Sequence, residues 1–275
     1  MTTFFADKVV LITGASAGVG LACARRFAQA NAKLVLVARG EEKLKAAADE
    51  LSSQTDVWTV PMDVTTVADC EALIANTVEH FGRLDVLVNN AGMHSRGSFD
   101  TKSTDAIAAM ADVNFRAPLV LSAAALPELK KNRGAIVMVG SLAGRTPMQG
   151  AATYGATKAG LRSFSLALRD ELADTGVRVG LVSPGPVDTG FIMEEIDQVE
   201  DIVFSQPMST AEEVADNVLK LASQDIAEIA MPSFSGFLTT ISYLFPGLRR
   251  GLRPKLYEKG RKNKDKYRQR NARMS

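Results

Sequence analysis

The fold of this chain is decided near its start by the stretch KVVLITGASAGVG, which occupies residues 8–20. The unbroken apolar run from Val9 to Ile12 predicts a β-strand buried on both faces, as in a parallel sheet covered by helices. Glycines follow at positions 14, 18 and 20, and a helix is expected to begin at about Gly18. This order of strand, glycine-rich turn and helix is typical of the first unit of a doubly wound α/β sheet.

The glycine-rich turn has the features of a phosphate-binding loop. Gly14 permits a tight turn, while Gly18 and Gly20 let the backbone approach a phosphate and let the helix pack closely on the sheet. The N-terminus of the helix can hold a pyrophosphate. Ordinary loops also carry glycines, so the motif alone leaves a purely structural role open. The turn residues expected to contact a bound dinucleotide are Gly14, Ser16, Ala17, Gly18, Val19 and Gly20.

The rest of the chain continues the alternation of strand and helix. A chain of 275 residues with 46% hydrophobic residues and a net charge of +1 suits one large α/β domain. We expect a doubly wound parallel sheet with helices on both faces over residues 1–232, followed by an extension over residues 233–275. Short Val, Leu and Ile runs predict the seven strands near residues 8–13, 33–38, 57–61, 84–88, 134–140, 177–183 and 227–231.

Cysteine and histidine usage indicates a reducing compartment and no metal chemistry. Cys23 and Cys70 lie in predicted helices and form no disulfide framework. His80 and His94 offer no ligand cluster, so no catalytic metal is expected. Residues 1–7 are too few and too weakly apolar for a signal peptide. A cytoplasmic location is the resulting expectation.

Tyr154 and Lys158 are the first candidates for chemistry. Four residues make about one helical turn, so the phenol and the ammonium leave the same helix face as neighbours. A nearby positive charge lowers the pKa of a phenol toward the range of a general acid or base. Surface helices often carry such a pair, so the rest of the chain must decide its role.

Arg39 bears on the choice of cofactor. It follows the second predicted strand, where an acidic residue would bind the ribose 2′-hydroxyl of NAD. A guanidinium at this place favours a 2′-phosphate instead, so NADP(H) is expected in preference to NAD(H). An exposed arginine after a strand is also commonplace, and Ala17 adds no second basic residue.

Together, the motifs resemble those of the short-chain dehydrogenase/reductase family, in its single-domain branch. That branch has the pattern TGxxxGxG, NNAG, Asn, Ser, YxxxK and PG, and every element occurs here in order. The resemblance implies a Rossmann-like fold, a nicotinamide cofactor and reversible hydride transfer between that cofactor and an alcohol or carbonyl. The matching residues are Thr13–Gly20, Asn89–Gly92, Asn114, Ser141, Tyr154–Lys158 and Pro184–Gly185.

The resemblance also implies individual roles. Ser141 would hydrogen-bond the substrate oxygen, and Tyr154 would give it a proton or take one from it. Lys158 would lower the pKa of the tyrosine and bind the nicotinamide ribose, while Asn114 would order a water that links the lysine to solvent. Further cofactor contacts are expected from Asp63, Val64, Asn90, Ala91, Gly92, Pro184, Gly185, Val187 and Thr189. Asp63 can equally cap the helix after it.

The substrate is less well defined by the sequence. The loop 190–208 mixes apolar residues with an acidic run and has the composition of a lid. An apolar wall suits a hydrophobic ketone, aldehyde or secondary alcohol, with no evident cationic anchor. Such residues are also ordinary core residues, and His94 and Arg145 keep a polar substrate open. The expected wall residues are Met93, His94, Leu142, Met148, Gln149 and Phe191.

The C-terminal extension departs from the family pattern. Residues 234–248 are rich in Phe, Leu, Ile and Tyr, but Pro246 and Gly247 interrupt them, so no bilayer-spanning helix is expected. Residues 249–275 contain twelve Lys or Arg against two acidic residues, a local charge of +10, which leaves −9 on the preceding 248 residues. Three interpretations remain open: contact with a membrane face, packing on a subunit or on the chain's own acidic body, and a solvated tail. Nucleic-acid binding is not expected, because no stacking platform accompanies the basic run.

The sequence therefore predicts an NADP(H)-dependent carbonyl reductase or alcohol dehydrogenase, with reduction as the expected direction. The family resemblance also implies a homo-oligomer, a dimer or tetramer formed through helices near residues 106–131 and 152–175. The alternative is a cofactor-sensing protein that uses its extension to engage a partner or a membrane.

Overall fold

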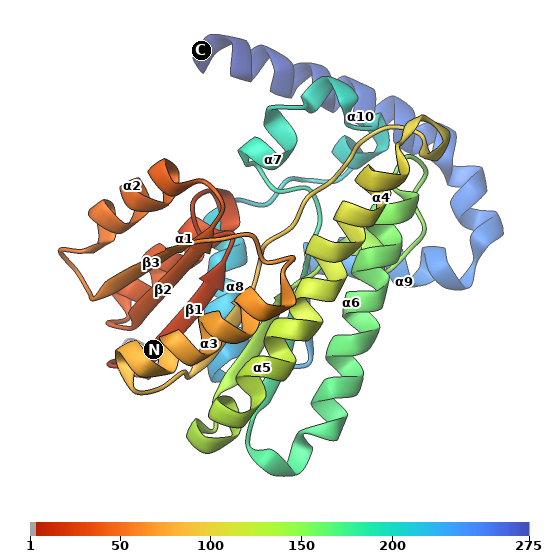
Figure 1. Ribbon diagram of the computed structural model, residues 1–275. Coiled ribbons are helices and arrows are strands. Elements are labelled where there is room, and N and C mark those ends of the chain that lie inside the picture. Colours follow the sequence, from red (N-terminus) through yellow and green to blue (C-terminus); the bar gives the residue numbers. More distant parts are fainter. Residues whose placement is uncertain (1–3, 275) are drawn as a thin grey trace.

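Seven parallel strands form a single sheet in a computed structural model that describes residues 4–274, with side chains to residue 270 (Figure 1). The strand order is β3-β2-β1-β4-β5-β6-β7, so the direction of winding reverses between β1 and β4. The strands are β1 (Val9–Thr13), β2 (Lys33–Ala38), β3 (Val57–Pro61), β4 (Val86–Asn89), β5 (Ala135–Val139), β6 (Arg178–Pro184) and β7 (Glu228–Met231). The predicted fold class is confirmed, because each expected strand lies within a residue or two of its predicted place.

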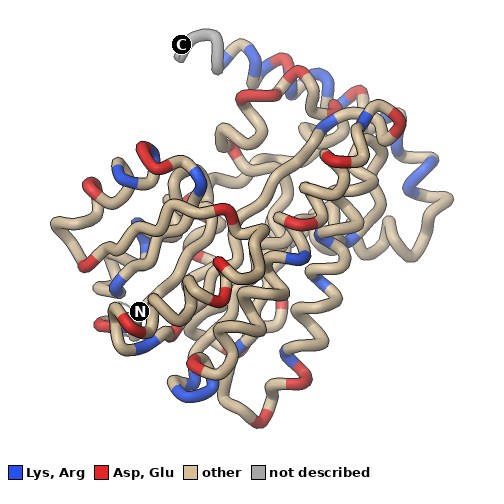
Figure 2. The backbone as a smooth tube through the Cα atoms, in the orientation of Figure 1, with Lys and Arg blue, Asp and Glu red and all other residues tan. Residues whose placement is uncertain are grey.

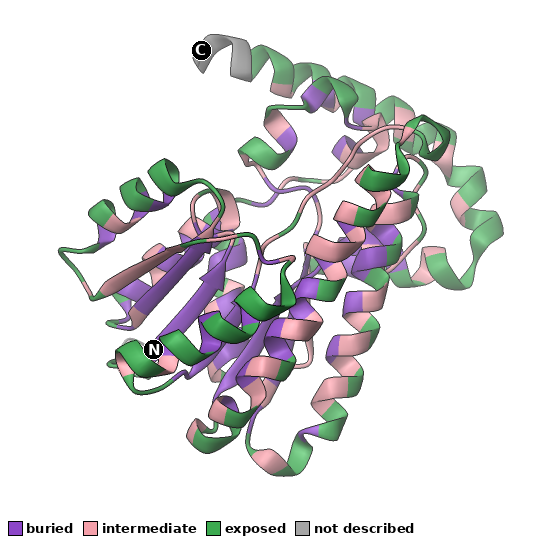
Figure 3. Ribbon diagram, in the orientation of Figure 1, coloured by how far each residue is buried: buried purple, intermediate pink, exposed green. Residues whose placement is uncertain are grey.

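Helices cover both faces of the sheet, and alternate strand residues divide the core between them. Val10 and Ile12 of β1 pack toward α1, α2 and α8, whereas Val9 and Leu11 pack toward α3, α5 and α6. Buried strands therefore lie between two outer layers of helices whose far sides are exposed (Figure 3). These helices are α1 (Gly18–Gln29), α2 (Glu41–Leu51), α3 (Val67–Phe81), α5 (Ala117–Asn132), α6 (Ala152–Glu171) and α8 (Ala211–Ser223).

A continuous helical segment, Thr104–Asn132, is apolar and long enough to cross a membrane, the one such segment in the part of the chain that the structure describes. It consists of α4 (Thr104–Ala111), a π-helical turn η2 (Asp112–Arg116) and α5. Its residues Leu121, Ala125 and Leu129 are buried in the core beneath the sheet. Its apolar composition is thus explained in part by core packing.

Short helices after β6 form the loop that the sequence predicted as a lid. They are α7 (Gly190–Met193), η5 (Ile196–Gln198) and η6 (Asp201–Ser205). Ile192, Ile196, Val199 and Phe204 are buried together in a small core of their own. We call residues 190–208 the lid segment.

The C-terminal extension is helical. A short helix α9 (Ser233–Leu244) packs beside β7, and a long helix α10 (Pro246–Met274) then crosses the molecule over the lid segment (Figure 1). Pro246 opens α10 at a position where its missing N–H costs no helical hydrogen bond. The extension is therefore an ordered part of the fold over its described residues.

Candidate active site

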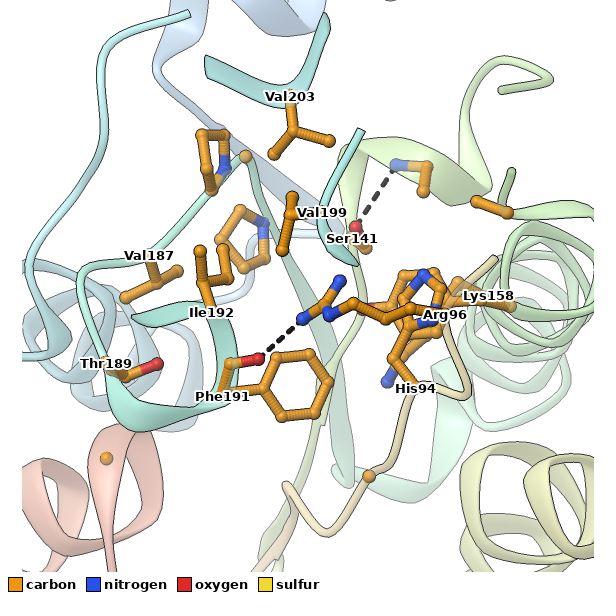
Figure 4. A pocket seen from close by; sticks show the side chains of 18 of the residues that line it. His94, Arg96, Ser141, Lys158, Val187, Thr189, Phe191, Ile192, Val199 and Val203 are labelled. Atoms are coloured by element: carbon orange, nitrogen blue, oxygen red, sulfur yellow. Dashed lines mark hydrogen bonds between the residues drawn. The ribbon is translucent and has the colours of Figure 1, made fainter. Parts of the chain in front are cut away.

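A cavity of about 440 Å³ opens at the carboxyl ends of β1, β4, β5 and β6. This is the place where doubly wound sheets bind ligands, because the loops diverge where the strand order reverses. One end lies against the glycine-rich turn and the other against the lid segment, and Figure 4 shows the lid end. Predicted cofactor residues that line the cavity are Gly14, Ala17, Gly18, Val19, Asn90, Ala91, Gly92, Tyr154, Lys158, Pro184, Gly185, Val187 and Thr189.

The glycine-rich turn leaves room for a phosphate. Gly14 and Gly18 adopt positive φ angles of 67° and 53°, which side chains rarely tolerate. A Cβ at Gly20 would stand 2.1 Å from the carbonyl oxygen of Gly14, so only glycine lets α1 approach the turn. A Cβ at Gly18 would meet nothing closer than Thr189 at 3.5 Å, so the helix N-terminus faces open space. The turn thus fits the pyrophosphate of a dinucleotide.

The turns after β1 and β4 are joined by the buried hydroxyl of Thr13. Its oxygen accepts hydrogen bonds from the backbone N–H groups of Asn90 and Ala91, both at 3.0 Å. The Asn90 amide in turn donates to the carbonyl oxygens of Thr13 and Gly14, at 2.8 and 3.2 Å. Asn90 therefore fixes the shape of the glycine-rich turn as well as lining the cavity.

Some predicted cofactor residues lie outside the cavity lining. Ser16 is half-buried within the turn, and Arg39 is exposed directly after β2. The Asp63 carboxylate accepts a hydrogen bond from the N–H of Thr65 at 2.9 Å, which favours the alternative of a turn that leads into α3. Val64 is buried in the core beside Cys70.

Lys43 is a cofactor candidate that the sequence analysis missed. It lies in the first turns of α2 and lines the cavity near the glycine-rich turn. It lies four residues after Arg39 in the sequence, on the helix that follows β2. Its signal in the sequence was weak, because a lysine on an exposed helix is ordinary.

Ser141, Tyr154 and Lys158 meet at the inner wall of the cavity. Ser141 follows β5 and begins the short helix η3 (Leu142–Gly144), whereas Tyr154 and Lys158 lie on α6. The Ser141 hydroxyl accepts a hydrogen bond from the Ala143 N–H at 3.1 Å and lies near enough to the Tyr154 phenol to act on its pKa. A Cβ at Gly144 would stand 2.6 Å from the backbone of Lys158, so this glycine lets η3 and α6 approach closely.

Burial changes the acidity of both α6 side chains. It raises the pKa of the Tyr154 phenol, whereas the nearby Ser141 hydroxyl and then the charge of Arg96 act to lower it. The pKa lowering expected from the sequence is therefore wrong for this form of the site. Burial also lowers the pKa of the Lys158 ammonium to about 8. Its Nζ donates to the carbonyl oxygen of Val139 at 2.8 Å and lies 5.9 Å from the centre of the Tyr154 ring.

Asn114 is fully buried in the π-helical turn between α4 and α5. Its amide donates to the carbonyl of Met93, and its side-chain oxygen accepts from the Met93 N–H, both at 2.8 Å. It thereby holds the loop after β4 against α6. Single π turns inside α-helices frequently occur at functional sites.

His94 lies directly on the tyrosine. Its ring stacks on Tyr154 with 4.3 Å between centroids and 21° between planes. Burial, and then the charge of Arg96, lower the pKa of His94 to about 4, so the ring is neutral near pH 7. The predicted wall residues His94, Leu142, Met148, Gln149 and Phe191 all line the cavity, whereas Met93 is absent from the lining and its backbone serves Asn114 instead.

Arg96 is the second residue that the sequence analysis missed, and it corrects the expectation of a wall without a cation. Its side chain is only 7% exposed and lies in the cavity beneath the lid segment (Figure 4). It donates to the carbonyl oxygen of Phe191 at 2.5 Å and pairs with Glu195 at 3.1 Å. Arg145, which the sequence left open, lies outside the lining and pairs with Glu228 next to β7.

The distal half of α10 packs on the acidic part of the lid segment. Lys264 is buried and donates to the carbonyl oxygen of Val199 at 2.6 Å and to Asp201 at 3.2 Å. Arg268 pairs with Asp197 at 2.6 Å. Just before the midpoint of α10, Tyr257 donates to Glu200 at 3.1 Å. Opposite charges therefore alternate along this contact (Figure 2). Of the alternatives left open, packing on the chain's own acidic body is confirmed for this half.

A seven-stranded nucleotide-binding sheet with serine, tyrosine and lysine at the carboxyl ends of its strands defines a dehydrogenase-type site. The family model for short chain dehydrogenase matches residues 8–200, and the chain belongs to that family. It is therefore an oxidoreductase that uses a nicotinamide cofactor, as the motifs predicted.

Curated relatives agree with the family assignment. An uncharacterized oxidoreductase of Staphylococcus epidermidis is 38% identical over 184 residues, which are 66% of this chain and 79% of the relative. An uncharacterized oxidoreductase of Staphylococcus aureus is 38% identical over 188 residues, 68% of this chain and 81% of the relative. The 11-beta-hydroxysteroid dehydrogenase-like 2 protein of Arabidopsis thaliana is 35% identical over 246 residues, 87% of this chain and 78% of the relative.

Proposed function

We propose that the protein is an NADP(H)-dependent reductase of apolar ketones or aldehydes that also runs in reverse on secondary alcohols. The observation that carries the proposal is that Tyr154, Ser141 and Lys158 lie on the wall of one cavity that continues to the glycine-rich turn. The nicotinamide, when bound, supplies or accepts the hydride. The protein's own groups supply the proton and the hydrogen bonds to the substrate oxygen.

Tyr154 acts as the general acid in reduction. Its raised pKa keeps the phenol protonated near pH 7, which is the form that gives a proton to a carbonyl oxygen. Ser141 donates a hydrogen bond to the same oxygen, so developing negative charge meets two donors that are already in place. In reverse, Tyr154 takes the proton back from the alcohol.

Lys158 and Asn114 support the tyrosine. An ammonium with a pKa of about 8 exchanges its proton readily near neutral pH, so Lys158 restores the proton that Tyr154 gives away. Lys158 also serves to bind the nicotinamide ribose. A Cβ at Gly92 would stand 3.3 Å from the Asn114 oxygen and 3.7 Å from the Lys158 Nζ, so the three groups adjoin and suit a water that links the lysine to solvent.

Two cations support NADP(H) over NAD(H). Arg39 follows β2, at the position that meets the adenosine ribose in this kind of sheet. Lys43, four residues later, lines the cavity. Together they suit the two negative charges of a 2′-phosphate. Preference for NADP(H) supports reduction as the working direction.

Apolar side chains on the lid support an apolar substrate. Phe191, Ile192, Val199 and Val203 line the cavity from the lid, opposite Leu142. The guanidinium of Arg96 binds the Phe191 carbonyl and Glu195, so its charge is used to hold the lid segment and not to bind the substrate. A ketone with an extended hydrocarbon body suits this wall.

Assembly and location complete the proposal. The exposed faces of Thr104–Asn132 and α6 provide the surfaces for a homo-oligomer. Cys23 and Cys70 are buried free thiols, which suit the reducing cytoplasm. The alternative of a cofactor-sensing binding protein gains no support, because the chain belongs to a family of oxidoreductases.

The test is NADPH and NADH oxidation, followed by absorbance, across aromatic, aliphatic, steroidal and small polar carbonyls. Turnover of the apolar members with NADPH is expected. The double variant Arg39→Ala with Lys43→Ala should raise the KM for NADPH tenfold or more and leave that for NADH unchanged, since a charge-assisted hydrogen bond is worth about 1.5–3 kcal/mol. Lys45→Ala on the exposed side of α2 is the matched control. Equal use of both cofactors by the wild type would refute the NADP(H) preference.

A further inference from the structure

The extension carries an unusual concentration of exposed apolar side chains. Among residues 4–270, thirteen large hydrophobic side chains are substantially exposed, and nine of these lie in α9, the first part of α10 and the residue between them. Soluble surfaces seldom gather so many in one short segment. The nine are Phe234, Phe237, Leu238, Tyr243, Leu244, Phe245, Leu248, Leu252 and Leu256, and Figure 3 shows the exposure of both helices.

The same segment is cationic and contains no acid. Residues 229–257 include no Asp or Glu, whereas Arg249, Arg250, Arg253 and Lys255 fall among the exposed leucines of α10. Leu248, Leu252 and Leu256 recur every four residues, so they lie along one side of the helix. We call these four cations and the nine apolar residues the C-terminal patch.

The cations of the patch differ from those further along α10. Distal Lys264, Arg268 and Arg270 form ion pairs with acids of the lid segment or the loop before it. No ion pair involves the four patch cations within residues 4–270; Arg249 reaches only the Pro147 carbonyl, and Arg253 lies over the ring of Tyr257. Ion pairs with the body of the protein are therefore formed by cations of the distal half of α10, whereas the four patch cations form none.

The segment that carries the patch is held on the body of the protein at two points. Within it, Thr239 on α9 is buried and accepts a hydrogen bond from Arg145 at 3.2 Å. Beyond it, Gly260 packs so closely on η6 that a Cβ would stand 1.9 Å from the Asp201 carbonyl oxygen. These two contacts make the patch a preformed surface.

The charge of the C-terminal patch indicates what binds to it. A second copy of the chain, packed patch to patch, would bring eight unpaired cations together, because a two-fold interface places the same surface on both sides. A nucleic acid would satisfy the cations but would leave the phenylalanines and leucines in water. An anionic bilayer satisfies both, since apolar side chains enter the boundary between headgroups and acyl chains while Lys and Arg meet the headgroup charge.

We propose that the C-terminal patch docks the protein peripherally on anionic membranes. The apolar side chains of α9 and early α10 enter the interface, and the four cations bind the lipid headgroups. The distal half of α10 stays folded on the lid segment, so docking places the lid and its cavity next to the membrane.

The test is co-sedimentation of the full chain with phosphatidylcholine vesicles, with and without phosphatidylserine, at low and high salt. Binding is expected with phosphatidylserine and should weaken at high salt. The variant Arg250→Ala with Lys255→Ala should bind about thirtyfold more weakly, because each cation near an anionic surface contributes about fivefold. Its control is Lys45→Ala with Lys130→Ala, which removes two exposed cations elsewhere.

A second pair of variants tests the apolar contribution. Phe237→Ser removes a phenylalanine that is 61% exposed, and Phe99→Ser removes one that is 59% exposed outside the patch. Only Phe237→Ser should weaken vesicle binding, by tenfold or more. Thermal melts check that each variant folds.

Two outcomes of the vesicle assay would overturn the proposal: no sedimentation of the wild type with phosphatidylserine vesicles, or equal effects of the patch and control variants. A third would be that Phe237→Ser changes a dimer to a monomer in analytical ultracentrifugation without an effect on vesicle binding. That result would assign the patch to a second copy of the chain. The assay measures no turnover, so its outcome is independent of the proposed reductase activity.

Discussion

Replacing Lys158 by Met should change how stability depends on pH. Burial lowers the pKa of Lys158 from 10.5 to about 8. The unfolded chain therefore binds more protons than the folded chain between these values, and the free energy of unfolding rises with pH across that window. At about 1.36 kcal/mol per pKa unit, burial of the ammonium costs about 3 kcal/mol at pH 7, and about 2 kcal/mol of this is relieved by pH 9.5.

The cost of burying the ammonium is measured by urea unfolding of the wild type and Lys158→Met at pH 7 and pH 9.5, at one protein concentration. Met has a similar length, and the loss of the hydrogen bond to the Val139 carbonyl affects both pH values equally, so it cancels from the comparison. Between pH 7 and pH 9.5, the free energy of unfolding of the wild type should rise by about 2 kcal/mol relative to that of the variant. A stability difference that stays constant within about 0.5 kcal/mol would refute the burial argument, because the lysine would then titrate as in water.

Three further perturbations follow from the site and the extension. Tyr154→Phe should abolish turnover while NADPH still binds by fluorescence titration, and full residual activity would contradict the acid–base role. Arg96→Met should lower kcat/KM by about 10- to 100-fold, because it removes the hydrogen bond and ion pair that hold the lid; unchanged steady-state kinetics would exclude that role. Gly260→Ala should destabilise the protein by about 1–3 kcal/mol in urea unfolding, because its Cβ would meet the Asp201 backbone. Gly251→Ala, where a Cβ meets nothing within 4 Å, is its control, and equal stability of the two variants would contradict the packing of α10 on η6.

The strands and the glycine-rich turn were predictable because their causes are local. An apolar run such as Val9–Ile12 can be buried on both faces only in a covered sheet, and a positive φ at Gly14 selects glycine whatever lies around it. The order of the motifs then placed Ser141 and Tyr154 at one edge, since parallel strands end on the same side. The family followed from these residues and is confirmed by the match over residues 8–200.

The direction of the Tyr154 pKa shift was not predictable, because it depends on how much water the fold removes. Spacing along a helix correctly placed the phenol near the ammonium of Lys158, but burial of both groups outweighs the effect expected from that spacing. Desolvation is a property of the packed cavity, and the residues that create it come from distant parts of the chain.

The sequence by itself determined the sheet, the dinucleotide turn and the chemical groups, because each depends on residue type and on spacing of a few positions. Only the tertiary structure decided that Arg96 meets Phe191 and Glu195, and that Lys43 lines the cavity. It also decided that distal cations of α10 such as Lys264 and Arg268 pair with acids of the lid segment, whereas the four patch cations form no ion pair. These contacts join residues up to about a hundred positions apart in the sequence. Contacts between residues so far apart along the chain depend on the path of the backbone and not on a local sequence pattern.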